Sequence, residues 1–241
     1  MDITDQIALV TGANRGIGRE FVQELLERGA RRVYATARRP ESIAIDDPRV
    51  VPLHLDLTDP ESVRAAARAA QDVTVLVNNA GISTGASLVT GDLAEVRREM
   101  DTHFWGTLAV IREFAPVLAG NGGGAIVTVL SALSWFSTAQ AGAYAAAKAA
   151  EWNMTNGVRL ELAAQGTIVQ GVLLGAADTD ITADYDGPKI DPREVPRRSL
   201  DGLADGSIEV IVDDWTAMVK DSLAGDPAPF YARMTQLLGA S

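Results

Sequence analysis

The stretch Thr11-Gly12-Ala13-Asn14-Arg15-Gly16-Ile17-Gly18 decides the fold of this chain. It follows the apolar run Ile7-Ala8-Leu9-Val10 and precedes a helical pattern, so the predicted order is strand, glycine turn and helix. Glycines let backbone N–H groups approach a ligand closely, and the N-terminus of the following helix favours negative charge. The stretch therefore predicts a pyrophosphate site. Its expected lining residues are Gly12, Asn14, Arg15, Gly16, Ile17 and Gly18.

Composition limits the fold and excludes several function classes. The 241 residues fit a single domain over 1–241, and 47% hydrophobic residues suffice for a large core. A net charge of −11 argues against a nucleic-acid partner. The chain has no cysteine, no apolar run long enough to span a membrane and no signal-peptide pattern. We therefore expect a cytoplasmic protein with neither a membrane partner nor a metal site.

Apolar runs alternate with helical patterns along the chain. The predicted strands are nearly continuous apolar segments, as is typical of strands buried on both faces of a parallel sheet. This alternation predicts an α/β fold: a Rossmann-type, doubly wound parallel sheet of about seven strands with helices on both faces. We expect strands at 7–11, 32–36, 50–56, 73–78, 124–130, 168–174 and 208–213. We expect helices at 16–28, 59–70, 92–118, 141–164, 192–204 and 214–224, and a short helix or loose tail over 225–241.

Positive charge follows the second predicted strand. In Rossmann domains an acid at this place binds the ribose 2′-hydroxyl of NAD, whereas a base accommodates the 2′-phosphate of NADP. Arg38 and Arg39 stand here, and no acid precedes Glu41. Arg15 is placed to reach the same phosphate, which guanidinium groups bind well. We therefore expect NADP(H) rather than NAD(H), with ordinary surface charge as the alternative role of the two adjacent arginines.

Two further strand ends carry polar or turn residues. Asp56 and Leu57 end the third predicted strand, and Asn79, Ala80 and Gly81 end the fourth. Ligands of open α/β sheets bind outside the carboxyl ends of the strands, so we expect all five residues at the cofactor. Asp56 could accept a hydrogen bond from an adenine amino group, or it could cap the next helix. The Asn-Asn-Ala-Gly sequence could also be simple turn chemistry.

A tyrosine and a lysine lie four residues apart in the helix predicted at 141–164. This spacing puts Tyr144 and Lys148 on one helix face. A phenol titrates at about 10, and a neighbouring ammonium favours the phenolate and lowers that pKa. We therefore expect Tyr144 to act as a general acid and base. Ser131 ends the fifth predicted strand, where its hydroxyl and Tyr144 would polarise one carbonyl oxygen; Ser134 is the alternative.

Together these motifs resemble the short, single-domain branch of the short-chain dehydrogenase/reductase family over about residues 5–180. The resemblance rests on Thr11–Gly18, Asn78–Gly81, Ser131, Tyr144 and Lys148. It implies a nicotinamide cofactor and hydride transfer at a carbonyl or secondary alcohol carbon. It also implies that Lys148 holds the nicotinamide ribose and that Ser131 orients the substrate. We expect an NADP(H)-dependent carbonyl reductase or alcohol dehydrogenase; an NADP-binding sensor without turnover is the alternative.

The chain departs from the family pattern at two places near the expected cofactor. His103 stands where the family usually has an asparagine that helps to link the catalytic lysine to solvent. Histidine donates, accepts and titrates near neutrality, so His103 could keep this proton relay, impair it or merely pack in its helix. After the sixth predicted strand, Leu174 replaces the usual proline, while Gly175 and Thr179 match residues that contact the cofactor in the family.

The substrate side is predicted from loop composition. The segment 182–205 has proline, glycine and charged residues, so we expect a mobile lid. Trp135, Phe136 and Tyr185 are candidate pocket walls, which favours a hydrophobic ketone or aldehyde as the small-molecule substrate. Packing within their loop is the alternative for Trp135 and Phe136. The helices predicted at 92–118 and 141–164 are the expected interface of a homodimer, with a homotetramer as the alternative.

Overall fold

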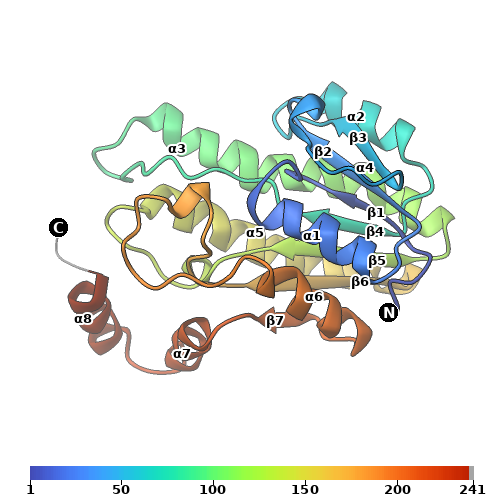
Figure 1. The fold of residues 1–241 in the computed structure, drawn as a ribbon. Helices are drawn as coiled ribbons and strands as arrows, with labels where there is room; N and C mark the ends of the chain where they lie inside the picture. Colours follow the sequence, from blue (N-terminus) through green and yellow to red (C-terminus); the bar gives the residue numbers. More distant parts are fainter. Residues whose placement is uncertain (239–241) are drawn as a thin grey trace.

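A computed structural model describes residues 1–238, which fold around one parallel sheet (Figure 1). Within these residues the sheet has seven strands in the order β3-β2-β1-β4-β5-β6-β7, and every neighbouring pair is parallel. The strands are β1 (Ile7–Val10), β2 (Arg32–Ala37), β3 (Val50–His54), β4 (Val75–Asn78), β5 (Gly124–Val129), β6 (Thr167–Leu173) and β7 (Glu209–Ile211). The strand order reverses between β1 and β4, as in a doubly wound sheet, and confirms the predicted fold.

Helices cover both faces of this sheet (Figure 1). On one face lie α1 (Gly16–Glu27) and α6 (Glu194–Ala204), and on the other lie α2 (Pro60–Ala69), α4 (Thr107–Gly120) and α5 (Gly142–Leu162). The helix α3 (Leu93–Met100) precedes α4, and α7 (Asp214–Ser222) and α8 (Pro227–Leu238) follow β7. The short helical turns are η1 (Pro40–Ser42), η2 (Asp101–Gly106), η3 (Ala132–Ser134), η4 (Ala163–Gln165) and η5 (Asp180–Thr182).

Two apolar clusters form the core, one on each face of the sheet. Along β4, Val75 and Val77 join the cluster under α1 and α6, whereas Leu76 joins the cluster under α2, α4 and α5. Phe21 of α1 and Phe114 of α4 are fully buried against these faces. Burying one such side chain stabilises a fold by about 1.5–3 kcal/mol. The packed faces leave the carboxyl edge of the sheet as the place for polar groups.

Three of the differences between the predicted and the observed elements concern the cleft or the end of the chain. The helix expected at 92–118 is α3 and α4 joined by η2, a π-helical turn. The strand β3 ends at His54, before Asp56. Residues 227–238 are helical, and the rest of the predicted tail, 239–241, lies outside the described residues. No helix of the described chain is both long and apolar enough to cross a bilayer.

Candidate active site

The glycine turn between β1 and α1 is held by hydrogen bonds to the residues that follow β4. Thr11 Oγ1 accepts from the backbone N–H groups of Asn79 (2.9 Å) and Ala80 (3.0 Å). The side-chain amide of Asn79 donates to the carbonyl oxygens of Thr11 (2.8 Å) and Gly12 (3.2 Å). A Cβ at Gly18 would overlap the Gly12 carbonyl oxygen, so backbone packing itself demands this glycine. Through these hydrogen bonds Asn79 positions the backbone of the glycine turn.

The N-terminus of α1 has the features of an anion site. Its N-cap residue Arg15 makes no side-chain capping bond, and its first turn carries no acidic residue. Gly16 has a φ of 52°, a conformation that glycine adopts without strain. The first N–H groups of α1 are therefore free of a competing carboxylate within the helix, and the helix dipole favours an anion there.

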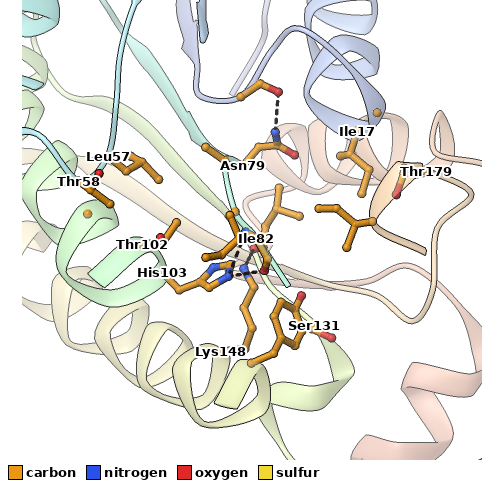
Figure 2. Close-up of a pocket in the computed structure, with 18 of the residues that line it drawn as sticks. Ile17, Leu57, Thr58, Asn79, Ile82, Thr102, His103, Ser131, Lys148 and Thr179 are labelled. Atoms are coloured by element: carbon orange, nitrogen blue, oxygen red, sulfur yellow. Dashed lines mark hydrogen bonds between the residues drawn. The ribbon is translucent and has the colours of Figure 1, made fainter. Parts of the chain in front are cut away.

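These groups open into a cleft of about 700 Å³ along the carboxyl edge of the sheet. In Figure 2, Ile17 and Thr179 lie on one side, Leu57 and Thr58 on the other, and His103, Ser131 and Lys148 between and below them. This volume is within the range of small-molecule and cofactor sites. The predicted residues that line it are Gly12, Asn14, Arg15, Gly16, Ile17, Arg38, Asp56, Leu57, Asn79, Ala80, Gly81, His103, Ser131, Tyr144, Lys148, Gly175 and Thr179.

Two predicted cofactor residues lie outside this lining. Gly18 lies in the first turn of α1 and packs against the Gly12 carbonyl oxygen of the glycine turn. Arg39 is exposed at the start of η1, past the point where Arg38 borders the cleft. Arg15 borders the cleft, but its guanidinium is paired with Asp180 at 2.8 Å. Of the three expected phosphate ligands, Arg15 and Arg38 thus border the cleft, and Arg39 lies outside its lining.

The aromatic residues expected as pocket walls lie elsewhere. Phe136 is buried and packs edge-on against Trp215 of α7 (5.7 Å between ring centroids) and Phe230 of α8 (5.3 Å). Trp135 packs against the same cluster, and Tyr185 lies outside the cleft lining with 38% of its surface exposed. Trp135 and Phe136 lie there because α7 and α8 fold over the segment after β5. Packing was the alternative role given for Trp135 and Phe136, and it explains the positions of both side chains.

Ser131 and Tyr144 meet at the end of β5 and the start of α5. The Ser131 hydroxyl hydrogen-bonds to the Tyr144 phenol, and its oxygen also accepts from the N–H of Leu133 at 3.1 Å. Ser134 is buried outside the cleft lining, where its hydroxyl accepts a long hydrogen bond from the N–H of Ser131 (3.4 Å). Ser131 rather than Ser134 therefore faces the cleft beside Tyr144.

Lys148 is held in a buried position below the Tyr144 ring. Its Nζ lies 5.9 Å from the ring centroid and donates to the Val129 carbonyl oxygen (2.9 Å) and to Glu151 Oε2 (2.6 Å). Glu151 Oε1 accepts from Thr107 Oγ1 at 3.0 Å. Burial acts to lower the pKa of Lys148, but Glu151 and Tyr144 outweigh it and raise that pKa above its ordinary value. The side chain is therefore a buried ammonium.

The pKa of Tyr144 differs from the expectation drawn from the spacing. Lys148 does act to lower it, but burial of the phenol acts more strongly in the other direction, and Glu151 and Glu99 add to burial. The net result is a pKa above the ordinary value for tyrosine. The phenol is therefore neutral at neutral pH in the free protein, which suits a proton donor.

His103 lies inside the π-helical turn, a kind of turn often found at functional sites. It is buried, and its Nε2 is 2.9 Å from the Ile82 carbonyl oxygen and 3.3 Å from Glu99 Oε2. The backbone N–H of Ile82 also lies 3.4 Å from Nε2. The ring meets Tyr144 edge-on at 5.4 Å, and a Cβ at Gly81 would come within 2.5 Å of its Cε1. Gly81 is thus required by the histidine.

Two buried glutamates, Glu99 and Glu151, were missed by the sequence reasoning. Glu99 Oε1 accepts from the N–H of Thr84 at 2.6 Å. Burial acts to raise the pKa of Glu99, but the nearby His103 ring and the hydrogen bond from the Thr84 N–H bring it below its ordinary value. Helical spacing was the available signal, since Glu99 precedes His103 by four residues and Glu151 follows Lys148 by three.

The turn after β6 is fixed by a residue from the C-terminal part of the chain. The N–H of Gly175 donates to Asp213 Oδ2 at 2.8 Å. The same carboxylate accepts from Thr216 and caps α7. Asp213 thus restrains the cleft-lining turn at which Leu174 replaces the family's proline.

Comparisons with known proteins agree with this geometry. The family model for short chain dehydrogenases matches residues 6–189. A short chain dehydrogenase from Burkholderia cenocepacia J2315, solved in complex with NADP, is 40% identical, with 97% of this chain and 98% of that chain covered and a TM-score of 0.93. One from Streptomyces avermitilis is 26% identical, with coverages of 97% and 96% and a TM-score of 0.82. An uncharacterized oxidoreductase of Staphylococcus aureus strain MW2 is 30% identical over 218 residues, 85% of this chain and 94% of that protein. The chain belongs to the short-chain dehydrogenase/reductase family of oxidoreductases.

Proposed function

We propose that this protein is an NADP(H)-dependent oxidoreductase that reduces the carbonyl group of an apolar ketone or aldehyde to an alcohol. The observation that carries the proposal is a single cleft that joins the open N-terminus of α1 to Ser131, Tyr144 and Lys148. The first group fits a pyrophosphate, and the second fits a carbonyl oxygen that must be protonated. A hydride donor held between them would face the carbonyl carbon.

The residues present fit NADP(H). Gly12 and Gly16 leave a cradle without side chains, with φ values of 65° and 52°, at the start of α1. Arg15 and Arg38 border the same cleft and would hold a 2′-phosphate. Lys148 would hold the hydroxyls of the nicotinamide ribose. The NADP complex of the Burkholderia relative supports this choice of cofactor. When bound, the reduced nicotinamide supplies the hydride.

The proton is supplied by the chain itself. A carbonyl oxygen placed between Ser131 Oγ and Tyr144 Oη would accept a hydrogen bond from each hydroxyl. In the reduction, Tyr144 Oη would give up its proton to the carbonyl oxygen, which would leave the alcohol and a Tyr144 phenolate. The Lys148 ammonium stabilises that phenolate until a proton from solvent restores the phenol. The neutral phenol of Tyr144 is the form that donates a proton in carbonyl reduction.

The substrate class follows from the apolar part of the lining. Ile82, Leu174 and Ile181 border the cleft together with Ser131 and Tyr144. Aliphatic walls of this kind favour an apolar substituent on the carbonyl over a charged sugar. These three side chains replace the aromatic residues that the sequence pointed to.

The test is NADPH consumption, measured as absorbance loss, with a panel of ketones and aldehydes. Tyr144→Phe should abolish turnover and retain NADPH binding, whereas Tyr231→Phe, an exposed change on α8, should alter neither. Turnover by Tyr144→Phe would contradict the assigned donor. Binding of NADPH without oxidation by any carbonyl would favour the sensor instead. Arg38→Asp should weaken NADPH binding relative to NADH, and an unchanged ratio would remove Arg38 from the phosphate site.

We further expect a homo-oligomer with a small-molecule substrate. Leu93 on α3 and Leu160 on α5 are 57% and 80% exposed, on helices predicted to form the interface of a dimer. Their exposure supports burial by a second copy. Sedimentation of the purified protein distinguishes a monomer, a dimer and a tetramer.

A further inference from the structure

The carboxylate of Glu151 makes the shortest polar contact of Lys148. The two residues lie three apart on α5, and each is at most 5% exposed. Glu151 Oε2 is 2.6 Å from Lys148 Nζ, and Oε1 is bound by the Thr107 hydroxyl at 3.0 Å. Because both oxygens have donors, the carboxylate has a fixed orientation toward the ammonium.

We propose that Glu151 is the positioning residue of Lys148, and that it holds the ammonium back from Tyr144 and so limits how far the lysine favours the phenolate. The effect of Glu151 on catalysis rests on the proposed function, whereas the titration that tests its effect on Tyr144 does not.

The geometry of the ammonium supports the positioning role. An ammonium has three donors, and here one is spent on the Val129 carbonyl oxygen and one on Glu151. One donor remains for the cleft, where Tyr144 and the ribose would lie. The lysine stem is flexible, so Nζ would be free to move toward the phenol if Glu151 were removed. Glu151 therefore limits how closely the positive charge approaches Tyr144.

The balance of charge supports the second part. Lys148 and Glu151 are a buried pair of opposite charge, so Tyr144 experiences a nearly compensated pair rather than an isolated cation. Beyond α5, Glu99 on α3 adds negative charge, and the His103 ring on η2 faces the phenol edge-on. Negative charge close to a phenol disfavours the phenolate. The pKa of Tyr144 is accordingly raised by burial first, lowered by Lys148, and raised again by Glu151 and Glu99.

His103 is the other basic side chain close to Glu151. His103 Nδ1 lies 3.8 Å from Glu151 Oε2 and has no hydrogen-bond partner among residues 1–238, while Nε2 faces Ile82 and Glu99. Although a histidine and two glutamates gather here, no group of side chains in the described chain is arranged to hold a metal ion. Of these two basic side chains, Lys148 makes the shorter contact with Glu151, at 2.6 Å.

The proposal is tested by titrating Tyr144 directly in the cofactor-free protein. The chain has four tyrosines, so carbon-13 labelling of tyrosine gives four phenol resonances, and Tyr144→Phe identifies the one of interest. In Glu151→Gln the shape is kept and the charge removed, so the Tyr144 midpoint should fall, with a several-fold higher phenolate fraction at any pH below it. The matched control is Glu161→Gln, an exposed change on the same helix, which should leave the midpoint in place. Glu151→Asp keeps the charge and should restore a midpoint close to that of the wild type.

An unchanged midpoint in Glu151→Gln, or an equal shift in Glu161→Gln, would overturn the proposal. If Glu151→Gln does not fold, Thr107→Val, which removes the hydroxyl that holds Glu151 Oε1, should also lower the Tyr144 midpoint, and an unchanged midpoint would contradict the proposal. Failure of the proposed function would show separately, as absence of NADPH consumption with every carbonyl, because the titration needs neither cofactor nor substrate.

Discussion

An ion pair at the mouth of the cleft predicts a competition for Arg15. Arg15 belongs to the glycine turn and Asp180 to η5, and their side chains are 2.8 Å apart, 62% and 68% exposed respectively. A cofactor 2′-phosphate bound by Arg15 would have to displace the Asp180 carboxylate from the guanidinium. The free protein therefore favours a state that opposes NADPH binding, and Asp180→Asn should remove the competitor.

The size of the effect follows from the exposure of the pair. Exposed ion pairs contribute about 0–1 kcal/mol, and a tenfold change in affinity corresponds to about 1.4 kcal/mol. Asp180→Asn should thus tighten NADPH binding by up to about fivefold. Binding of NADH, which lacks the 2′-phosphate, should change less. Because salt screens exposed charges, the difference between the two cofactors should shrink as ionic strength rises.

The assay is a fluorescence titration of each reduced cofactor at low and high salt, which gives the ratio of the NADPH and NADH dissociation constants. Asp184→Asn is the matched control, since Asp184 is an exposed acid of the same segment and removes one charge in the same way. An unchanged ratio in Asp180→Asn, or the same change in Asp184→Asn, would show that Asp180 and the 2′-phosphate do not share Arg15.

Three further predictions concern stability. Gly18→Ala should lower the free energy of unfolding by about 1–3 kcal/mol, measured in urea, because the new methyl group would overlap the Gly12 carbonyl oxygen; an unaltered value would contradict the tight turn. Asp213→Ala should lower the free energy of unfolding by about 0.5–2 kcal/mol, because α7 loses its cap. It should also weaken NADPH binding, because the Gly175 turn loses its restraint; an unchanged NADPH affinity would show that this turn does not depend on Asp213. The lowered pKa of Glu99 means that its stabilisation is present above the ordinary pKa of glutamate and is lost as pH falls through the folded value. Glu99→Gln should accordingly flatten the acid side of the stability profile, and an equally steep profile would exclude Glu99 as its source.

The sheet and the cofactor edge were predictable because they depend on local signals. The glycine turn, the apolar strands and the spacing of Tyr144 and Lys148 are all contained in short windows of sequence. The structure confirms the predicted fold and brings Ser131, Tyr144 and Lys148 to one cleft.

The remaining features depend on contacts between distant segments. Trp135 and Phe136 turn away from the cleft because α7 and α8, some eighty residues later, cover them. Arg15 is paired because η5 reaches back over the glycine turn. Glu151 has a recognisable spacing from Lys148, but only the packing of α4 on α5 makes both residues buried. The direction of the Tyr144 pKa shift follows from that burial, which no spacing rule contains.

The placement of the acid–base group on α5 bears on how this protein could be redesigned. Tyr144, Lys148 and Glu151 are carried by one 21-residue helix packed on the sheet, whereas Ile181 borders the cleft from a short surface turn. Randomising position 181 would reshape the mouth of the cleft without replacing any side chain that handles the proton. Directed evolution confined to that turn could therefore change the substrate range while Tyr144, Lys148 and Glu151 stay unchanged.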